Sequence, residues 1–198
     1  MTRDTPEGAA LLDAASALLA EEGPEALTVR RIAARAGCST MLVYSRLGGK
    51  AGVVEALFIE GFERLTSVMQ TVRTTGDPLA DLRRCARAYR KFALDNPTYY
   101  AVMFEGAVPD FVWTPEAAAI AAGTLGVLAA KVQRAIDAGL LVAGPARDIA
   151  ACLWAANHGC VSLERKQVGP PDIDWPKRYA QVGDAMLTGL APSVSHSS

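Results

Sequence analysis

The amino-acid sequence predicts an all-α protein in which a small N-terminal group of three helices is followed by a larger helical bundle. Apolar residues recur at the helical period along most of the chain, and no segment alternates apolar and polar residues as a half-buried strand does. Glycine and proline interrupt this pattern between the expected helices. Apolar residues make up 51% of the 198 residues, which is enough to bury a core.

The first two helices have clear start and stop signals. The first is expected to begin after Thr5 as its N-cap and to end at Gly23-Pro24, with leucine and alanine on one face. The second begins after Thr28 as its N-cap and breaks at Gly37, because glycine adopts a positive φ angle without strain. Each helix is therefore expected to turn one apolar face toward a shared core.

A third short helix is expected to begin at Ser39 or Thr40 and to stop at Gly48-Gly49. Two short helices that cross steeply need small residues where their backbones meet. Ala33 supplies such a contact and Gly37 makes the turn. The pattern therefore predicts a helix-turn-helix motif, whose small core is expected to consist of Ile32, Ala36 and Val43.

The rest of the chain is expected to form six further helices, at about 50–74, 79–95, 98–104, 114–139, 145–166 and 175–190. Gly76-Asp77-Pro78 is a clear break, and we place a hinge in or near the helix that precedes it. The expected organisation is an N-terminal domain at 1–50, a linking helix at about 50–75, a larger domain at 76–191 and a disordered tail at 192–198.

Basic residues gather in two segments that contain no acid. The net charge is −1 and the isoelectric point is near 6.1, so any affinity for DNA must come from a local patch. The first segment holds Arg30, Arg31, Arg35, Arg46 and Lys50. The second lies opposite the apolar stripe of the helix at 79–95 and is expected to be its solvated face; it holds Arg83, Arg84, Arg87, Arg90 and Lys91.

The cysteine and histidine content argues against a metal site. Cys38, Cys85, Cys152 and Cys160 form no CxxC pair, and the chain has two histidines, so we expect free thiols, no metal and no cofactor. A redox sensor is the alternative interpretation of the thiols. The charged N-terminus does not resemble a signal peptide, and no apolar run approaches the ~20 residues that cross a bilayer. The protein is therefore expected to be cytoplasmic, without a membrane partner.

The third helix offers side chains that suit a DNA major groove. Hydroxyl and basic groups suit phosphates, and short apolar groups suit thymine methyl groups. These side chains are Thr40, Met41, Leu42, Tyr44, Ser45 and Arg46. From these residues alone, a plain helical hairpin in an all-α protein is the alternative.

The run Leu27-Thr28-Val29-Arg30-Arg31-Ile32-Ala33 is followed by Ala36-Gly37, Tyr44 and Lys50. With the apolar first helix, this pattern resembles the N-terminal DNA-binding domain of TetR/AcrR-family transcriptional regulators, over residues 11–65. The resemblance implies that Thr28 and Arg30 contact a phosphate, that Thr40 and Ser45 reach bases or nearby phosphates, and that Tyr44 and Lys50 hold the DNA backbone. The full expected set of DNA contacts is Thr28, Arg30, Ser39, Thr40, Met41, Leu42, Tyr44, Ser45, Arg46 and Lys50.

The sequence departs from the family pattern in three places. Met41-Leu42 stands where a small residue followed by threonine is common. Ser45-Arg46-Leu47 stands where an aromatic-His-Phe run is frequent, and Gly48-Gly49 replaces a polar step into the next helix. These departures affect which DNA sequence is read rather than whether DNA is bound.

Two further segments, 96–104 (N-P-x-Y-Y-x-V-M-F) and 153–164 (L-W-A-A-N-H-G-C-V-S-L-E), resemble a C-terminal regulatory domain of that family named for a Trp-His-Gly signature. The matching residues here are Trp154, His158 and Gly159. Glycine inside a helix costs about 1 kcal/mol relative to alanine, so Gly159 indicates a close helix–helix approach. We interpret His158 as a structural histidine in preference to a ligand contact.

Aromatic and methionine side chains are abundant in the larger domain. Any one of them is as easily an ordinary core residue, but the resemblance implies a pocket for a small apolar or aromatic effector. Its expected lining is Tyr89, Phe92, Tyr100, Met103, Phe104, Phe111, Trp113, Trp154, Asn157 and His158.

The resemblance also implies that the last two long helices form a homodimer interface. The candidate contacts are Leu153, Val161, Tyr179, Val182 and Met186. A single short reading helix contacts few bases, whereas a two-fold dimer reads both halves of a palindrome.

The sequence is therefore identified as that of a ligand-responsive DNA-binding regulator, a repressor that binds a palindromic operator as a homodimer and leaves it when an effector binds. One alternative is a small-molecule-binding helical protein with no DNA role. Another is a helical enzyme in which Cys152 or Cys160 pairs with His158, although no catalytic signature accompanies these residues.

Overall fold

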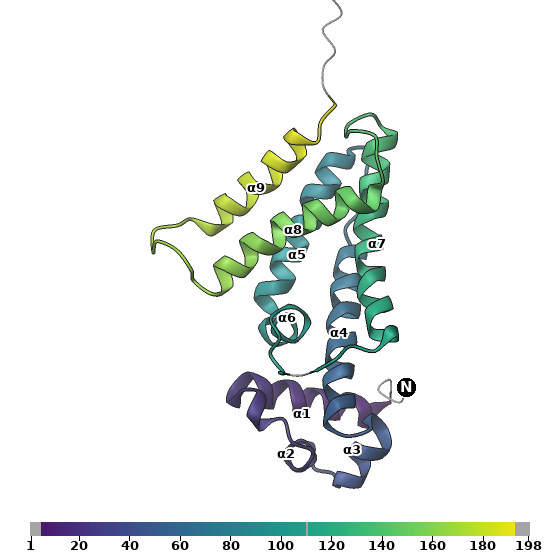
Figure 1. Cartoon of the computed structure of the whole chain (residues 1–198), viewed down its shortest axis with the longest axis vertical. Coiled ribbons are helices and arrows are strands. Elements are labelled where there is room, and N and C mark those ends of the chain that lie inside the picture. Colours follow the sequence, from purple (N-terminus) through teal and green to yellow (C-terminus); the bar gives the residue numbers. More distant parts are fainter. Residues whose placement is uncertain (1–4, 110, 193–198) are drawn as a thin grey trace, which may run out of the picture. The chain divides into compact units, whose positions relative to one another are not determined.

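The computed structural model describes residues 5–109 and 111–192, and within these ranges the chain is helical with no strand. Of the expected tail at 192–198, residues 193–198 lie outside the described residues. The all-α prediction is confirmed. The helices are α1 (Pro6–Glu22), α2 (Val29–Arg35), α3 (Thr40–Leu47), α4 (Lys50–Gln70), α5 (Pro78–Asp95), α6 (Pro97–Phe104), α7 (Pro115–Asp137), α8 (Ala146–Arg165) and α9 (Trp175–Gly189) (Figure 1).

The predicted caps of the first two helices are present, and Ser39, one of the two predicted starting residues, caps the third helix. The side-chain oxygen of each cap accepts a hydrogen bond from the backbone N–H three residues later, at 3.1 Å for Thr5, 3.3 Å for Thr28 and 3.3 Å for Ser39. Each bond satisfies a donor that the first turn of a helix leaves without an intrahelical partner. Local sequence therefore fixes where these helices begin.

Helix ends depart from the predictions by a few residues. The long fourth helix ends at Gln70 and not near residue 74, and the Thr71 hydroxyl donates to the carbonyl of Val68 at 2.7 Å just beyond this end. A short 3₁₀ helix, Pro24–Ala26, follows α1 where a plain break was expected. Frayed or 3₁₀ helix ends are common, and such differences do not alter which side of a helix faces the core.

The chain divides into two compact units, each built from two stretches of sequence. The first unit comprises the residues up to Arg64 together with Asn96–Ala121. The second comprises Leu65–Asp95 together with the residues from Ala122 onward. Residues 96–121, which the sequence analysis placed in the larger domain, pack with the N-terminal helices. The functional division into segments 1–50 and 76–191 stays a prediction.

In the first unit, α1, α2 and α3 enclose a small core (Figure 1). Leu11, Leu27, Ile32 and Val43 are almost completely buried there. The helix α6 packs against α1 and approaches α4 so closely that a Cβ on Gly61 would lie 2.6 Å from the Met103 sulfur. A glycine at this position therefore allows the close approach of α4 and α6.

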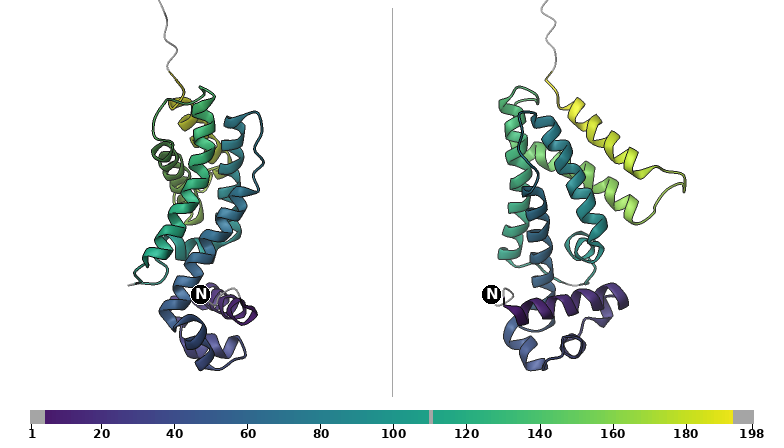
Figure 2. Two further views of the ribbon diagram at one scale, coloured as in Figure 1. Left: turned by 90° about the vertical axis from the view of Figure 1, so that its right-hand side faces the viewer. Right: turned by 180° about the vertical axis from the view of Figure 1, so that it is seen from behind.

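In the second unit, α8 and α9 lie side by side, as Figure 2 also shows. Arg90 on α5 forms a two-point ion pair with Glu164 on α8, and the Tyr179 hydroxyl on α9 donates to the carbonyl of Ala86 at 2.7 Å. These contacts fasten α5 to both C-terminal helices. The buried core is formed by Leu82, Val132, Ala135, Leu141, Ile149, Ala150, Leu153 and Leu187.

The basic stripe on α5 is only in part the solvated face that was predicted, because Arg87 and Lys91 are exposed while the three other basic residues form ion pairs that the prediction did not include. Arg90 binds Glu164 of α8, and Arg83 lies 2.7 Å from Asp184 of α9. Arg84 pairs with the buried Asp81 on its own helix. The stripe therefore joins helices, because acids distant in the sequence lie opposite it.

The helix α7 is long and apolar enough to span a membrane by length and composition, with a mean hydropathy of 1.3 over its best window. The sequence analysis expected no such stretch. Alanine supplies much of the apolar content of this helix, while Val132 and Ala135 of its inner face are completely buried in the second unit. Within the structure, 22% of that window is buried.

Candidate functional site

The crossing of α2 and α3 has the small core that a helix-turn-helix requires. Ile32 and Ala33 of α2 and Val43 of α3 are buried, and Gly37 adopts the expected positive φ of 67° in the turn between the helices. Ala36 was predicted to complete this core but is half-exposed, because it caps the C-terminus of α2. The predicted arrangement is otherwise confirmed.

One face of α3 is open to solvent and is rich in side chains that suit DNA. Met41 is 73% exposed and Tyr44 is 57% exposed, and Thr40 and Ser45 are exposed beside them. Buried Val43 and Leu47 anchor the opposite face, one helical turn apart. A short helix anchored in this way presents its outer face as a rigid reading surface.

Several of the predicted DNA contacts also have local roles. The Thr28 and Ser39 hydroxyl oxygens accept from backbone N–H groups, which leaves each hydroxyl hydrogen for a phosphate. The Ser45 hydroxyl donates to the carbonyl of Leu42 at 3.1 Å, so in this rotamer its oxygen remains as an acceptor. Leu42 is half-buried and offers less surface than Met41.

Two arginines of the first basic segment are paired with acids of α1. Arg31 Nη2 lies 2.5 Å from Glu22 Oε1, and Arg35 Nη2 lies 2.6 Å from Glu21 Oε1. The hydrogen bond from Arg35 holds the pKa of Glu21 below its usual range. The segment itself contains no acid, yet these two acids of α1 lie against it in space.

The remaining cations of this segment flank the open face of α3. Arg30 and Lys50 are exposed, and no ion pair is recorded for either within residues 5–109 and 111–192. Arg46 is half-exposed and its Nη2 lies 4.0 Å from Glu7 Oε2, at the limit of an ion pair. The local positive charge that faces outward is therefore smaller than the count of five basic residues indicated.

Glycines hold the end of α3 close to the start of α4. Gly48 is left-handed with a φ of 72°, and Gly49 also has a positive φ, of 93°. A Cβ on Gly52 would lie 1.6 Å from the carbonyl oxygen of Leu47, and one on Gly49 would lie 3.0 Å from the Tyr44 ring. This corner couples the position of α3 directly to the first turn of α4.

A cavity of about 300 Å³ lies within the first unit, next to α4 and α6. Met103, Phe104, Phe111 and Trp113 of the predicted effector lining contact it, whereas Tyr100 is completely buried beside Phe104. Sequence analysis missed the rest of the lining, because small apolar residues carry no signal that separates a cavity from a core. These residues are Val54, Val102, Gly106, Val108 and Pro109.

Aromatic stacking and a hydrogen bond attach one wall of this cavity to α4. The Trp113 ring stacks on Phe58 with centroids 3.6 Å apart, and Phe111 meets Trp113 edge-on at 4.8 Å. The Thr114 hydroxyl donates to the carboxylate of Glu55, and its oxygen caps α7 by accepting from the Ala117 backbone N–H. Glu55 and Phe58 lie one and four residues after Val54, so these contacts reach the part of α4 that lines the cavity.

The other predicted effector residues belong to the second unit. Tyr89 Oη and His158 Nδ1 are 3.0 Å apart, and the Trp154 ring lies beside His158. Asn157 donates from Nδ2 to the carbonyl of Leu153 at 2.9 Å, while its Oδ1 is buried without a hydrogen-bond partner. Phe92 is buried. The structure divides the predicted set between the two units, and a ligand role for these side chains stays a prediction.

Three of the five predicted dimer contacts need correction. Leu153, Val161 and Tyr179 are at most 5% exposed within a single chain, so they are core residues and offer almost no surface to a second copy. Val182 and Met186 are half-buried. The large apolar residues that α8 does expose are Trp154 and Leu163.

Two of the cysteines, Cys85 and Cys160, lack the features of an activated nucleophile. Burial raises the pKa of Cys160, and burial raises the pKa of Cys85 to about 11. A thiolate is the reactive form of cysteine, so these shifts disfavour nucleophilic chemistry at neutral pH. His158 Nδ1 lies against the Tyr89 hydroxyl.

The chain is similar to the HTH-type transcriptional activator FasR of Mycolicibacterium smegmatis, with 32% identity over 120 residues, which are 60% of this chain and 53% of that protein. The chain thus spans about half the length of this curated relative. A protein of unknown function from Rhodococcus sp. RHA1 has the same fold, with a TM-score of 0.83, 23% identity, and coverage of 95% of this chain and 97% of that chain. The fatty acid degradation regulator FadR from Bacillus halodurans shares it too, with a TM-score of 0.74, 18% identity, and coverage of 94% and 97%.

Two family descriptions match the chain. "Bacterial regulatory proteins, tetR family" matches residues 11–57, and "Tetracyclin repressor-like, C-terminal domain" matches residues 82–188, which are more than half of the chain. The second description does not mention a Trp-His-Gly type, so that subtype stays a prediction. The matches cover both the helix-turn-helix and the C-terminal helices, and the chain belongs to the TetR family of bacterial regulatory proteins.

Proposed function

We propose that this protein is a transcriptional regulator that binds operator DNA through α3 and changes its DNA affinity when a small effector binds. The observation that carries this proposal is the open face of α3, with Met41 and Tyr44 exposed while Val43 and Leu47 anchor the helix. Large exposed apolar side chains on a short, rigid helix are explained by a partner surface. Thr28, Arg30 and Lys50 flank this face and would contact phosphates.

We further propose that the DNA-binding form is a homodimer joined through α8 and α9. Cys152, Ala155, Gly159 and Leu163 form an exposed stripe along α8 at helical spacing. No atom of the same chain lies within 4 Å of a Cβ built on Gly159 or Gly183, so neither glycine is needed for packing inside the protomer. A close approach of the helices of a second copy would explain both.

We propose that the regulator is a repressor, which covers a palindromic operator and leaves it when the effector binds. Binding of the effector would change the separation of the two reading helices of the dimer. A difference of a few kcal/mol between the two states is enough to switch occupancy. Activation is the second candidate, because the M. smegmatis relative is named a transcriptional activator.

A mobility shift with the DNA upstream of the protein's own gene tests DNA binding. We expect wild-type protein to shift this duplex, and Arg46→Ala and Tyr44→Phe to weaken binding at least fivefold. Val112→Ala, a change at an exposed residue far along the chain from α3, is the control. Equal affinity of all four proteins would refute the assignment of α3. A reporter fused to this DNA then separates a repressor, whose deletion raises transcription, from an activator, whose deletion lowers it.

A protein with this function acts on bacterial DNA, so we place it in the cytoplasm and assign it no catalytic step. A small-molecule binder without a DNA role would bind an effector yet fail the mobility shift. A helical enzyme would show turnover that His158→Ala abolishes.

A further inference from the structure

Two acids at the end of α1 lie against two arginines of α2. Arg35 donates from both terminal nitrogens, at 2.7 and 2.6 Å, to the two carboxylate oxygens of Glu21. Arg31 donates from Nη2 to both oxygens of Glu22, at 2.5 Å each. We refer to these two contacts as the α1–α2 ion pairs. Carboxylates and phosphates bind a guanidinium group in the same way, so an arginine that is held by a carboxylate is less available to a phosphate.

The stability of the fold does not explain the position of these acids. The C-terminal end of a helix is its negative end, where an acid is unfavourable and a cation is favourable. Glu21 and Glu22 are the last two residues of α1, and the last turn of α1 contains no basic residue. Exposed ion pairs contribute little to stability, and α1 and α2 already share the buried core that contains Leu11 and Ile32. The acids therefore indicate a role that goes beyond holding α1 to α2.

The place of α2 in the motif makes its arginines relevant to DNA affinity. In a helix-turn-helix the first helix crosses the DNA backbone while the second enters the major groove. An arginine of α2 that no acid holds would therefore meet a phosphate. Each of the α1–α2 ion pairs removes one such contact from each protomer.

The loss of these contacts affects operator DNA and unrelated DNA differently. Binding to unrelated DNA is supplied almost entirely by phosphate contacts, and the protein settles where most of its cations meet phosphates. On an operator, base contacts made by α3 fix the register, so a further cation adds affinity only if a phosphate lies within its reach. Fewer free cations on α2 therefore lower the affinity for unrelated DNA more than the affinity for the operator. This ratio decides occupancy, because an operator competes with about 10⁶ or more other sites in a genome.

Other cations of the same segment are left for DNA. Arg30 is exposed next to Arg31, and no ion pair is recorded for it in the described part of the chain. Arg46 of α3 lies 4.0 Å from an oxygen of Glu7, which is a looser contact than either of the α1–α2 ion pairs. The acids of α1 therefore hold some arginines of the motif firmly and leave others available.

We propose that Glu21 and Glu22 are specificity-determining residues, which hold Arg35 and Arg31 away from phosphates and so raise the preference of the protein for its operator over unrelated DNA. This inference rests on the proposed DNA-binding function. It assigns a role in DNA recognition to two side chains that themselves contact no DNA.

Glu21→Gln tests this inference, with Glu25→Gln as the matched control. Both changes remove one exposed carboxylate within four residues of each other, but only Glu21 has a recorded ion pair in the described residues. The two duplexes are the DNA upstream of the protein's own gene and a shuffled sequence of the same length and composition. The freed Arg35 adds about two phosphate contacts per dimer, so Glu21→Gln should raise the affinity for the shuffled duplex about tenfold and that for the upstream duplex less than about threefold. Glu25→Gln should change either affinity less than about twofold.

Fluorescence anisotropy with the two labelled duplexes, repeated at several salt concentrations, measures both affinities and their salt dependence. On the shuffled duplex, the slope of log affinity against log salt should become steeper by about 2 in Glu21→Gln. The double variant Glu21→Gln, Arg35→Gln has the net charge of the wild type and lacks the freed arginine. It should therefore regain the preference and the slope of the wild type.

Thermal unfolding checks that each variant folds, and Glu22→Gln, which frees Arg31, is the corresponding change at the second pair. The inference is overturned if Glu21→Gln keeps the wild-type preference, even with a lower melting temperature, because the pair is then only a structural contact. It is also overturned if Glu25→Gln loses the preference to the same extent, or if the Arg35 change does not restore it. Failure of the proposed function looks different, because the wild type then binds the two duplexes equally.

Discussion

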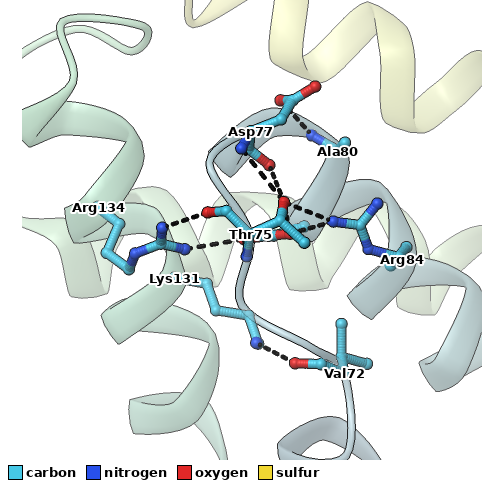
Figure 3. Close-up of polar contacts among 8 residues, drawn as sticks. Val72, Thr75, Asp77, Ala80, Arg84, Lys131 and Arg134 are labelled. Atoms are coloured by element: carbon cyan, nitrogen blue, oxygen red, sulfur yellow. Dashed lines mark hydrogen bonds and ion pairs between the residues drawn. The ribbon is translucent and has the colours of Figure 1, made fainter.

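Arg134 on α7 donates a hydrogen bond of 2.8 Å from Nη1 to Oδ2 of Asp81, a completely buried carboxylate on α5. Figure 3 shows that Arg134 also donates to the carbonyl of Thr75, at 2.7 Å, and that Arg84 approaches from the other side. The Thr75 backbone N–H and hydroxyl donate to the same carboxylate, at 2.9 and 2.8 Å. The loop between α4 and α5 is thereby tied to α7.

We predict that Asp81→Asn lowers the free energy of unfolding by about 2–3 kcal/mol, because it removes the charge that its arginines and Thr75 were arranged to bind. Urea unfolding at fixed protein concentration measures this. Asp184→Asn, which breaks the exposed pair with Arg83, is the matched control and should cost less than about 1 kcal/mol. Equal losses of unfolding free energy in the two variants would show that the burial of Asp81 does not strengthen its interactions.

The same carboxylate predicts a dependence of stability on pH. Burial alone would raise the pKa of Asp81, but the hydrogen bonds from Thr75 and the two arginines outweigh it and hold the pKa well below its usual range. A lowered pKa stabilises the folded state above the unfolded pKa of about 4, and this stability is lost as pH falls toward the folded pKa. The difference in stability between wild type and Asp81→Asn should therefore shrink below pH 4. A constant difference down to pH 2 would contradict this.

The ion pairs of α2 predict which arginines contact DNA. Arg30→Gln should lower the slope of log affinity against log salt by about 2 per dimer, because one phosphate contact is lost in each protomer. Arg35 is held by Glu21 at 2.6 Å, so Arg35→Gln should change the slope by less than 1. Fluorescence anisotropy with labelled operator, at salt concentrations from about 50 to 300 mM around physiological ionic strength, measures both slopes. A larger effect at Arg35 than at Arg30 would reverse the assignment.

The corner between α3 and α4 predicts a strong effect of one methyl group. Gly52→Ala would place its Cβ 1.6 Å from the carbonyl oxygen of Leu47, so the corner must open and α3 must move. We expect at least a tenfold loss of operator affinity and a lower melting temperature. At Gly126 in α7, no atom lies within 4 Å of an added Cβ, and Gly126→Ala should raise stability by up to about 1 kcal/mol. Unaltered DNA binding by Gly52→Ala would show that the corner between α3 and α4 can accommodate the methyl group without moving α3.

The exposed stripe on α8 predicts which side chains hold the dimer. Leu163 is exposed, and a glutamate there would place a charge in an apolar interface, so Leu163→Glu should give monomers at micromolar concentration. Leu140→Glu makes the same change at an exposed leucine outside α8 and should leave the dimer intact. Sedimentation velocity distinguishes the two. A Leu163→Glu variant that stays dimeric would place the interface elsewhere.

Features set by neighbouring residues could be predicted from the sequence, and features set by distant residues could not. Thr5, Thr28 and Ser39 cap their helices through atoms three residues away, so the pattern identified the first two caps and placed the start of α3 at Ser39 or Thr40. Arg35 and Glu21 are 14 residues apart, and Arg90 and Glu164 are 74 apart, so both basic segments appeared free of acid.

The candidate sites show the same division. An apolar helical face looks alike whether it enters the core of its own chain or that of a partner, which is why Leu153, Val161 and Tyr179 were assigned to the interface. Phe111 and Trp113 could be predicted to line a pocket because they are aromatic, but nothing in the sequence distinguishes Val54 and Val102 from core residues. A cavity is the space that packed side chains leave unfilled, so its position depends on the tertiary packing and cannot be read from the sequence.

The most direct test of the account is selection of duplexes from a random DNA pool by the wild-type protein and by a Met41→Ala, Tyr44→Ala variant. We predict that the wild type enriches inverted repeats whose half-sites are separated by whole helical turns of about 10 base pairs. We predict that the variant, folded and dimeric, enriches different duplexes or none. Enrichment of the same duplexes by both proteins, or of none by the wild type, would contradict the claim that α3 reads DNA.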